Sequence, residues 1–310
     1  MTETDCRTEK IFFALGTACR ITVYGKNGAA AADAAKRRVM ELHRMLNAYD
    51  PESEISAVNA CAGIRPVEVS EDTLRLIRSA VAWSEETGGL LDITTTPLSL
   101  LWKTAIADRT LPRPGEVADR RSLVGYGDIL TEGNSVMLRR RGQRMDLGAT
   151  AKGYAADEAA RILKDARAAD AVINFGGTVR VLGQARRVGI QDPFGGNGSS
   201  FASVMLAGRA AVTSGIYEQC LTVGDERYHH IVDPRTGYPS RSGLQAVTLI
   251  GDSAEELDAL ATVSLITGPE KAAGLIRRSG AEAVFVRTDG EVYVTGGLRD
   301  VLEFKDRECS

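Results

Sequence analysis

The sequence predicts an α+β fold with mostly antiparallel strands. Two observations lead to this class: helical and strand-like segments are both numerous, and the strand-like segments crowd the middle of the chain without alternating with helices. A doubly wound sheet would need that alternation. No repeat, low-complexity tract or linker divides the 310 residues, so we expect a single domain over 1–310, with residues 1–9 flexible.

Helices are predicted from apolar spacing and from capping residues. Val39, Leu42 and Leu46 recur at helical intervals in an Ala-rich segment. Ser70 before two acidic residues is typical of a helix start, and Pro97 suits a first helical turn. The predicted helices cover residues 29–47, 70–86, 97–107, 153–166 and 254–266.

Strands are predicted where short β-branched runs are bounded by Gly, Pro or Asn. Residues 111–115, with two prolines and a glycine, are expected to interrupt regular structure. Residues 128–138 form a hairpin around 132–135, and a closing hairpin turns at Asp289-Gly290. The other predicted strands lie within residues 171–250.

Composition excludes several classes of protein. There are 38 Lys and Arg against 41 Asp and Glu, a net charge of −3, so no basic field for nucleic acid is present. The first apolar run, residues 11–15, is too short for a signal peptide, and no run could span a membrane. The five cysteines are scattered, which favours reduced thiols over a zinc site. We therefore expect a cytoplasmic protein without nucleic-acid or membrane partners.

Common nucleotide-binding and hydrolase motifs are absent. The sequence contains no P-loop, no G-x-G-x-x-G after a strand, no H-E-x-x-H and no G-x-S-x-G. The glycine-rich segment 195–200 precedes a strand, not a helix, and is interpreted as a flexible turn.

Residues 145–155 form a first candidate cluster, in which small residues follow Asp146 and lead to Lys152. Backbone N–H groups at a helix start bind anions, and a following lysine adds positive charge. The alternative is an ordinary turn into the helix with Asp146 as its cap.

A second cluster lies on the predicted helix 254–266. Ser253 with Glu256 three residues later is a capping box, which fixes where the helix begins. Asp258 and Thr262 are then four residues apart on one face, among apolar neighbours that predict burial of the carboxylate. A carboxylate and a hydroxyl are oxygen ligands suited to Mg²⁺. The alternative is an exposed aspartate and a threonine that bonds its own helix.

Histidines supply the third cluster. His229 and His230 come just before a turn-forming segment at 233–237. Neighbouring side chains of a strand point to opposite faces, so at most one of the two shares a site. Histidine is the usual general base near neutral pH, and the alternative is a pair of surface histidines. His43, on the Ala-rich helix, is expected to be structural.

Eight short segments occur in a recognisable order. They are L-G-T at 15–17, Y-D-P-E-S-E-I-S at 49–56, G-G-L-L-D-I-T at 88–94 with P-L at 97–98 and L-W at 101–102, D-L-G-A-T-A-K-G-Y at 146–154, N-F-G-G at 174–177, A-V-T-S-G at 211–215, H-I-V-D-P-R-T-G at 230–237 and D-A-L-A-T at 258–262. Together they resemble the motifs of the ApbE family of flavin transferases. Each motif is weak alone, and the specificity lies in their shared order.

The resemblance implies an α+β fold with FAD in a cleft between its halves. It also implies transfer of the FMN half of FAD to a Thr or Ser hydroxyl of a target flavoprotein through a phosphoester bond, with release of AMP. Asp258, Thr262 and the Ala149 carbonyl would bind Mg²⁺, and His230 would be the catalytic base. The residues that would line the FAD site are Leu15, Tyr49, Leu90, Leu91, Asp92, Asp146, Lys152 and Val232.

One position departs from the family pattern, since Leu15 stands where the family has Met; the change conserves volume. Two other functions remain open from the sequence. Water could replace the protein hydroxyl, which would make the chain an FAD pyrophosphatase that yields FMN and AMP. The chain could also bind FAD without chemistry, although a candidate base and two candidate metal ligands argue for catalysis.

Overall fold

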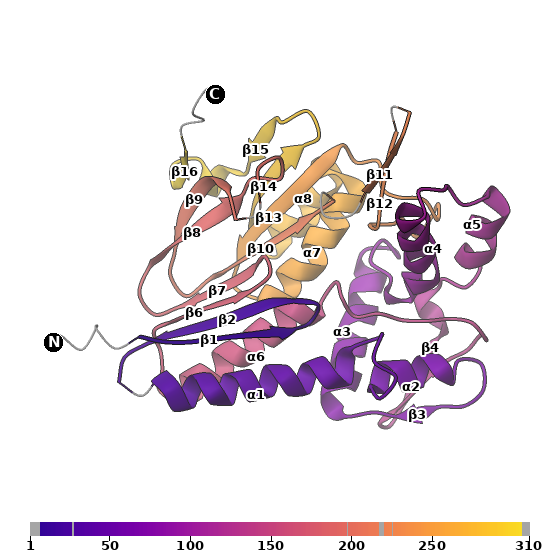
Figure 1. Cartoon of the computed structure of the whole chain (residues 1–310), viewed down its shortest axis with the longest axis horizontal. Helices are drawn as coiled ribbons and strands as arrows, with labels where there is room; N and C mark the ends of the chain where they lie inside the picture. The colour runs from indigo at the N-terminus through magenta and orange to yellow at the C-terminus, as the bar shows by residue number, and fades with distance from the viewer. Residues whose placement is uncertain (1–6, 27, 197, 217–219, 225, 306–310) are drawn as a thin grey trace.

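The computed structural model describes residues 7–26, 28–196, 198–216, 220–224 and 226–305. An eight-stranded antiparallel sheet forms its centre (Figure 1). Strands from early and late in the chain form its opposite edges. In order across the sheet these are β1 (Arg7–Ala14), β2 (Thr17–Tyr24), β6 (Ala171–Phe175), β7 (Thr178–Leu182), β10 (Ala210–Gly215), β13 (Leu244–Gly251), β14 (Glu282–Arg287) and β15 (Val292–Val294).

Helices cover one face of this sheet. α1 (Gly28–Leu46) packs on β1 and β2, α6 (Ala151–Asp165) on β6 and β7, and α7 (Ala254–Thr267) on β10 and β13, with α8 (Pro269–Arg278) beside α7. α1 buries a single apolar stripe, as an amphipathic helix does. α7 is buried almost all round because α6, α8 and the sheet enclose it.

A small sheet covers part of the other face. Its strands are β16 (Leu302–Phe304), β9 (Ser200–Leu206) and β8 (Arg186–Gln191), and a 3₁₀ turn η4 (Gly296–Leu298) lies beside it. Side chains of β13 point alternately to the two faces of the large sheet. Val247 and Leu249 pack in the core on the helical face, while Ala246 and Ile250 pack in the core beneath the small sheet.

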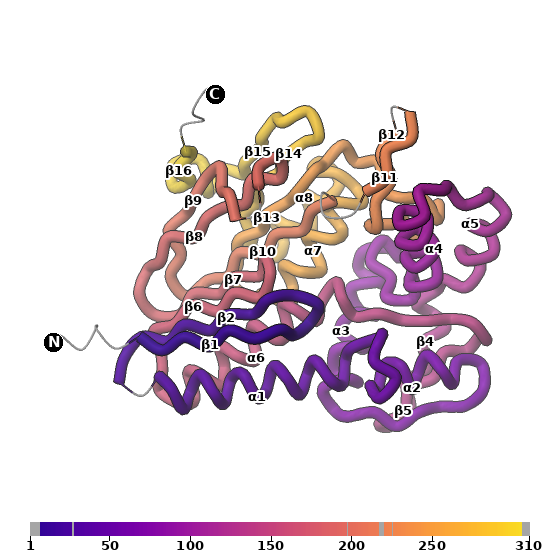
Figure 2. The backbone as a smooth tube through the Cα atoms, viewed as in Figure 1, coloured from indigo at the N-terminus to yellow at the C-terminus, as the bar shows by residue number. Residues whose placement is uncertain are grey.

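Residues 47–150 build a second lobe beside the sheet, visible as the purple part of the tube in Figure 2. Trp102 ties this lobe to the hairpin β11–β12. The Trp102 ring stacks on Tyr228 with centroids 5.4 Å apart, and its Nε1 donates to the Gly237 carbonyl at 2.8 Å. The hairpin consists of β11 (Cys220–Val223) and β12 (Glu226–His229). The lobe itself contains α2 (Glu54–Ala60), α3 (Glu71–Glu86), α4 (Thr96–Ala107), α5 (Pro114–Arg121), η2 (Ile93–Thr95), η3 (Tyr126–Asp128), β3 (Val67–Glu68), β4 (Ile129–Glu132) and β5 (Ser135–Leu138).

The predicted α+β class with antiparallel strands is confirmed, and the five predicted helices match α1, α3, α4, α6 and α7. One local prediction was wrong, and another held only in part. Residues 7–9 are not flexible, because they pair with β2 from Arg7↔Tyr24 onward; residues 1–6 lie outside the described part. Residues 111–113 interrupt regular structure between α4 and α5, as predicted, but residues 114–115 do not, because Pro114 occupies the first turn of α5, where its missing N–H costs nothing.

Among the described residues, no helix combines the length and the apolar character that crossing a bilayer requires.

Candidate active site

A cavity of about 840 Å³ lies between the second lobe and the sheet with its helices. Residues 90–103 of the lobe line one side, and residues of β10, α6 and α7 line the other. All the predicted site residues except Leu15 and Tyr49 line this one cavity. Those that do are Leu90, Leu91, Asp92, Asp146, Ala149, Lys152, His230, Val232, Asp258 and Thr262.

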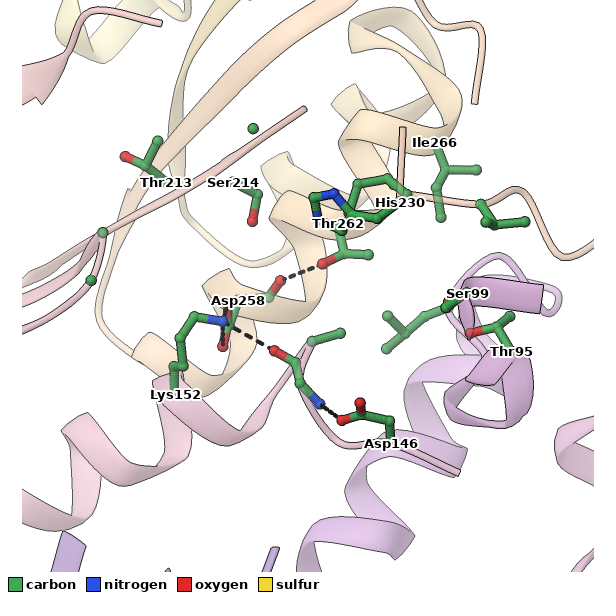
Figure 3. Close-up of a pocket in the computed structure, with 18 of the residues that line it drawn as sticks. Thr95, Ser99, Asp146, Lys152, Thr213, Ser214, His230, Asp258, Thr262 and Ile266 are labelled. Atoms are coloured by element: carbon green, nitrogen blue, oxygen red, sulfur yellow. Dashed lines mark hydrogen bonds and ion pairs between the residues drawn. The ribbon is translucent and has the colours of Figure 1, made fainter. Parts of the chain in front are cut away.

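α7 presents Asp258 and Thr262 to the cavity together (Figure 3). The helix begins as predicted, since Ser253 Oγ accepts from the Glu256 N–H at 3.3 Å. Burial of the carboxylate is also confirmed, because Asp258 is 1% exposed. The Thr262 hydroxyl donates to the Asp258 carbonyl at 3.2 Å, which is the helix back-bond that the sequence left open as an alternative.

The start of α6 supplies the partners of Asp258. Lys152 Nζ lies 3.3 and 3.4 Å from its two carboxylate oxygens and also donates to the Gly148 carbonyl at 3.0 Å. The Gly153 N–H donates to Oδ2 at 3.1 Å. Burial raises the pKa of Asp258, while Lys152 and the Gly153 N–H oppose that rise. The buried carboxylate is thus paired and hydrogen-bonded, as burial requires.

A tight turn leads into α6. Asp146 Oδ1 accepts from the Gly148 N–H at 2.9 Å, so the carboxylate shapes the loop that carries the Ala149 carbonyl. The buried side chain of Asn59 fixes the residue before it: its amide donates to the Met145 carbonyl at 2.9 Å and accepts from the Met145 N–H at 2.7 Å. Sequence reasoning missed Asn59, since nothing local connects residues 86 positions apart.

Asp92 organises the opposite wall. Its Oδ1 accepts from the Thr94 N–H and hydroxyl at 2.8 and 2.6 Å, and Oδ2 accepts from the Tyr126 N–H at 2.9 Å. Burial raises the pKa of this carboxyl, and these donors oppose the rise. Asp92 therefore both holds the η2 turn and lines the cavity.

The two adjacent histidines separate as predicted. His229 is 2% exposed; its Nε2–H donates to the Ser240 carbonyl at 3.1 Å, and its Nδ1 accepts from the Ile231 N–H at 3.3 Å. Burial lowers the pKa of His229 to about 4. His230 instead lines the cavity, and Figure 3 shows its ring near the part of α7 that carries Thr262.

Leu15 and Tyr49 lie outside the cavity lining. Leu15 occupies the β1–β2 turn in the left-handed region, with φ of 54°, and its N–H donates to His43 Nδ1 at 3.3 Å. This contact gives His43 the structural role that was predicted. Tyr49 is 55% exposed, and its hydroxyl accepts from Nζ of Lys103, which does line the cavity, at 3.0 Å.

Other polar residues that line the cavity were not singled out by the sequence. They come from two of the recognised motifs, 174–177 and 211–215, from the end of η2 and from α4. The motifs therefore pointed to the right segments without identifying these single residues. These residues include Thr95, Ser99, Lys103, Asn174, Thr213 and Ser214.

The donor set at α7 suits a hard cation. Among the described residues no group of three or more His, Cys, Asp and Glu could hold a metal, so a zinc-type centre is not formed by them. Asp258, Thr262 and the Ala149 carbonyl would offer one carboxylate and two neutral oxygens. Mg²⁺ is commonly held by one or two carboxylates and completed by water and substrate phosphates, so this set fits.

The fold defines the class of protein as that of the ApbE proteins. The chain matches the crystal structure of the ApbE protein from Thermotoga maritima with a TM-score of 0.86 and 31% identity, over 96% of this chain and 99% of the other. It matches the flavin transferase ApbE from Vibrio cholerae with a TM-score of 0.81, over 96% of this chain and 99% of the other. At 24% identity this likeness concerns the fold alone.

The chain belongs to the ApbE family, whose model matches residues 15–285. Curated relatives agree with this. A protein from Treponema pallidum named FAD:protein FMN transferase is 31% identical, over 94% of this chain and 88% of the relative. A protein of the same name from Klebsiella pneumoniae is 30% identical, over 92% of this chain and 90% of the relative.

Proposed function

We propose that this protein is a Mg²⁺-dependent FAD:protein FMN transferase. It transfers the FMN moiety of FAD to a Thr or Ser hydroxyl of a target flavoprotein and releases AMP. The observation that carries the proposal is that Asp258, Thr262, Ala149, Lys152 and His230 line one cavity of about 840 Å³. That volume falls in the upper part of the usual range for small-molecule sites, about 300–1,000 Å³, as a dinucleotide requires.

FAD is proposed to lie along the cavity. Leu90, Leu91 and Val232 supply apolar wall, and Asp92 and Asp146 shape the two turns that border it. Leu15 and Tyr49 would approach the bound dinucleotide from outside the lining, Tyr49 through its contact with Lys103. A Mg²⁺ held by Asp258, Thr262 and the Ala149 carbonyl would neutralise the pyrophosphate and stabilise charge that develops on its oxygens.

The proposed step is a phosphoryl substitution. The acceptor oxygen forms a bond to the phosphorus of the FMN half, and the bond from that phosphorus to the bridging oxygen breaks, so AMP leaves with that oxygen. The hydroxyl proton passes to His230, because an alcohol is a poor nucleophile at its own pKa. Lys152 contributes positive charge on the same side of the cavity as Asp258.

Incubation with FAD, Mg²⁺ and candidate acceptor flavoproteins tests the proposal. Covalently bound FMN on the acceptor with equimolar AMP supports it. Free FMN in place of labelled acceptor indicates a pyrophosphatase, and unchanged FAD indicates a binding protein; either outcome would refute transferase activity.

Two variants test the assigned roles. His230→Ala should lower the transfer rate by about 10²–10⁴-fold, the usual contribution of a general base, with the Kd for FAD nearly unchanged. Asp258→Ala should weaken Mg²⁺ and FAD binding together. Full transfer by His230→Ala would place the base elsewhere, and full Mg²⁺-dependent transfer by Asp258→Ala would exclude the metal site.

A further inference from the structure

The N-terminus of α7 is capped from outside its own sequence. Asp157, on the neighbouring helix α6, accepts through Oδ2 from the Ser253 hydroxyl and from the Glu255 N–H, both at 3.2 Å. Ser253 in turn accepts from the Glu256 N–H. A carboxylate at this position satisfies a free backbone donor and opposes the positive end of the helix dipole.

Asp157 is itself held in place by the sheet. Arg180 of β7 is 9% exposed, and its Nη1 lies 3.2 Å from Asp157 Oδ1. The same Nη1 donates to the carbonyl of Asp252, the residue before the Ser253 cap, at 2.5 Å. One guanidinium therefore joins the carboxylate of α6, the strand β7 and the entry to α7.

A second contact lies one turn earlier on α6. A Cβ on Gly153 would stand 2.1 Å from the Ala254 carbonyl oxygen, so only glycine lets the two helices approach this closely. The Gly153 N–H also donates to Asp258. Gly153 and Asp157, one turn apart on α6, thus both contact α7. Together the two contacts fix the rotation of α7 about its own axis and its position along α6.

We propose that Asp157 is a positioning residue: by capping α7 from α6 it holds Asp258 and Thr262 in the orientation that cation binding needs. This inference rests on the proposed function. Asp157 is not among the residues that line the cavity, so it acts through the helix and not on a ligand. Asp258 and Thr262 lie about one and two turns beyond the capped residues, on the same rigid helix.

Titration calorimetry of the full chain with Mg²⁺ alone tests this inference, without any need for catalysis. Asp157→Ala should raise the Kd for Mg²⁺ by about tenfold or more, as loss of a residue supporting metal ligands commonly does. Asp157→Asn, whose amide oxygen can still accept both hydrogen bonds, should stay within about threefold of the wild type. The kcat for FMN transfer by Asp157→Ala should recover at saturating Mg²⁺, because the defect lies in binding the cation.

Asp165→Ala is the matched control, since it removes a carboxylate of the same helix that contacts Arg161 at the surface. It should leave the Kd for Mg²⁺ unchanged. A lower melting temperature with an unchanged Kd for Mg²⁺ in Asp157→Ala would make Asp157 merely structural and overturn the inference. Equal loss in the Asn and Ala variants would equally overturn a role through the cap. Absence of Mg²⁺ binding by the wild type would refute the proposed function itself, which distinguishes the two failures.

Discussion

Lys152 Nζ lies 3.3 Å from Oδ1 and 3.4 Å from Oδ2 of Asp258, a side chain that is 1% exposed. The ammonium is the cation that accompanies this buried carboxylate in the structure, while the Gly153 N–H provides a neutral partner. A carboxylate this deeply buried is expensive unless it is paired. The position of Lys152 therefore matters for folding as well as for the proposed chemistry.

Replacing Lys152 by Met should lower the free energy of unfolding by about 3 kcal/mol, because a buried pair that loses one partner leaves an uncompensated charge. Mg²⁺ should restore part of the loss, since a bound cation would again neutralise Asp258. Urea unfolding with and without Mg²⁺ measures both effects. Lys164→Met, an exposed lysine on the same helix, is the control and should change little. Equal stability of the Lys152 and Lys164 variants would contradict this account of the pair.

His229 should make the stability of the protein depend on pH. Its folded pKa, about 4, lies below the ordinary value of 6.5, so the unfolded state binds a proton more readily. The stability it contributes is complete above about pH 6.5 and is lost as the pH falls toward 4, at most about 3 kcal/mol. Burial of the imidazole is the main cause of the low pKa. A proton on Nδ1 would also face the Ile231 N–H, a second donor.

Urea unfolding of the wild type and of His229→Gln between pH 4 and 7 gives the free energy of unfolding as a function of pH. The contribution of His229 is the difference between the slopes of the two curves. Gln does not titrate, so the variant should lose part of the pH dependence. Parallel pH profiles would show that His229 is not the titrating group.

Gly153→Ala should destabilise the protein by about 2 kcal/mol or more, because the new Cβ would meet the Ala254 carbonyl at 2.1 Å and the two helices would have to separate. Gly274→Ala on α8 is a matched helical control, with only the far end of Arg278 near its Cβ. It should be neutral or stabilising by up to about 1 kcal/mol. Thermal unfolding compares the two, and a Gly153 variant as stable as the control would contradict the close approach.

Asn59 should couple stability to FAD binding. Asn59→Ala leaves the N–H and the carbonyl of Met145 without their partner, at a cost of about 1–3 kcal/mol for each buried group. The same change frees the turn at Asp146, so the Kd for FAD should rise. Asn59→Asp retains an acceptor but loses the donor. Its stability and its Kd for FAD should therefore lie between those of the wild type and those of Asn59→Ala. Fluorescence titration of FAD with each variant checks the order; an unchanged Kd in Asn59→Ala would separate Asn59 from the site.

Local patterns predicted the parts of the site that local interactions determine. The Ser253 cap fixed the phase of α7 and placed Asp258 and Thr262 on one face, and strand alternation separated His229 from His230. The sequence could not supply partners distant along the chain. Asn59 reaches residue 145 and Asp157 reaches residue 253, and only tertiary packing brings such pairs together.

The same limit explains the wrong prediction for residues 7–9. Glu9 and its neighbours are polar and lie near the end of the sequence, which suggests a flexible segment. Residues 7–9 pair directly with residues 22–24 of β2 in a local hairpin, and the pairing of β2 with β6, more than 140 residues later, places this hairpin in the sheet. Sheet partners at that separation leave no trace in a local window.

The most direct test of the account is a crystal structure with FAD and Mn²⁺ in place of Mg²⁺, read from the anomalous scattering of manganese. We predict a single strong peak in the cavity, coordinated by an Asp258 carboxylate oxygen, the Thr262 hydroxyl and the Ala149 carbonyl, and in contact with the FAD pyrophosphate. A manganese peak bound to other residues, or FAD bound outside this cavity, would contradict the central claim.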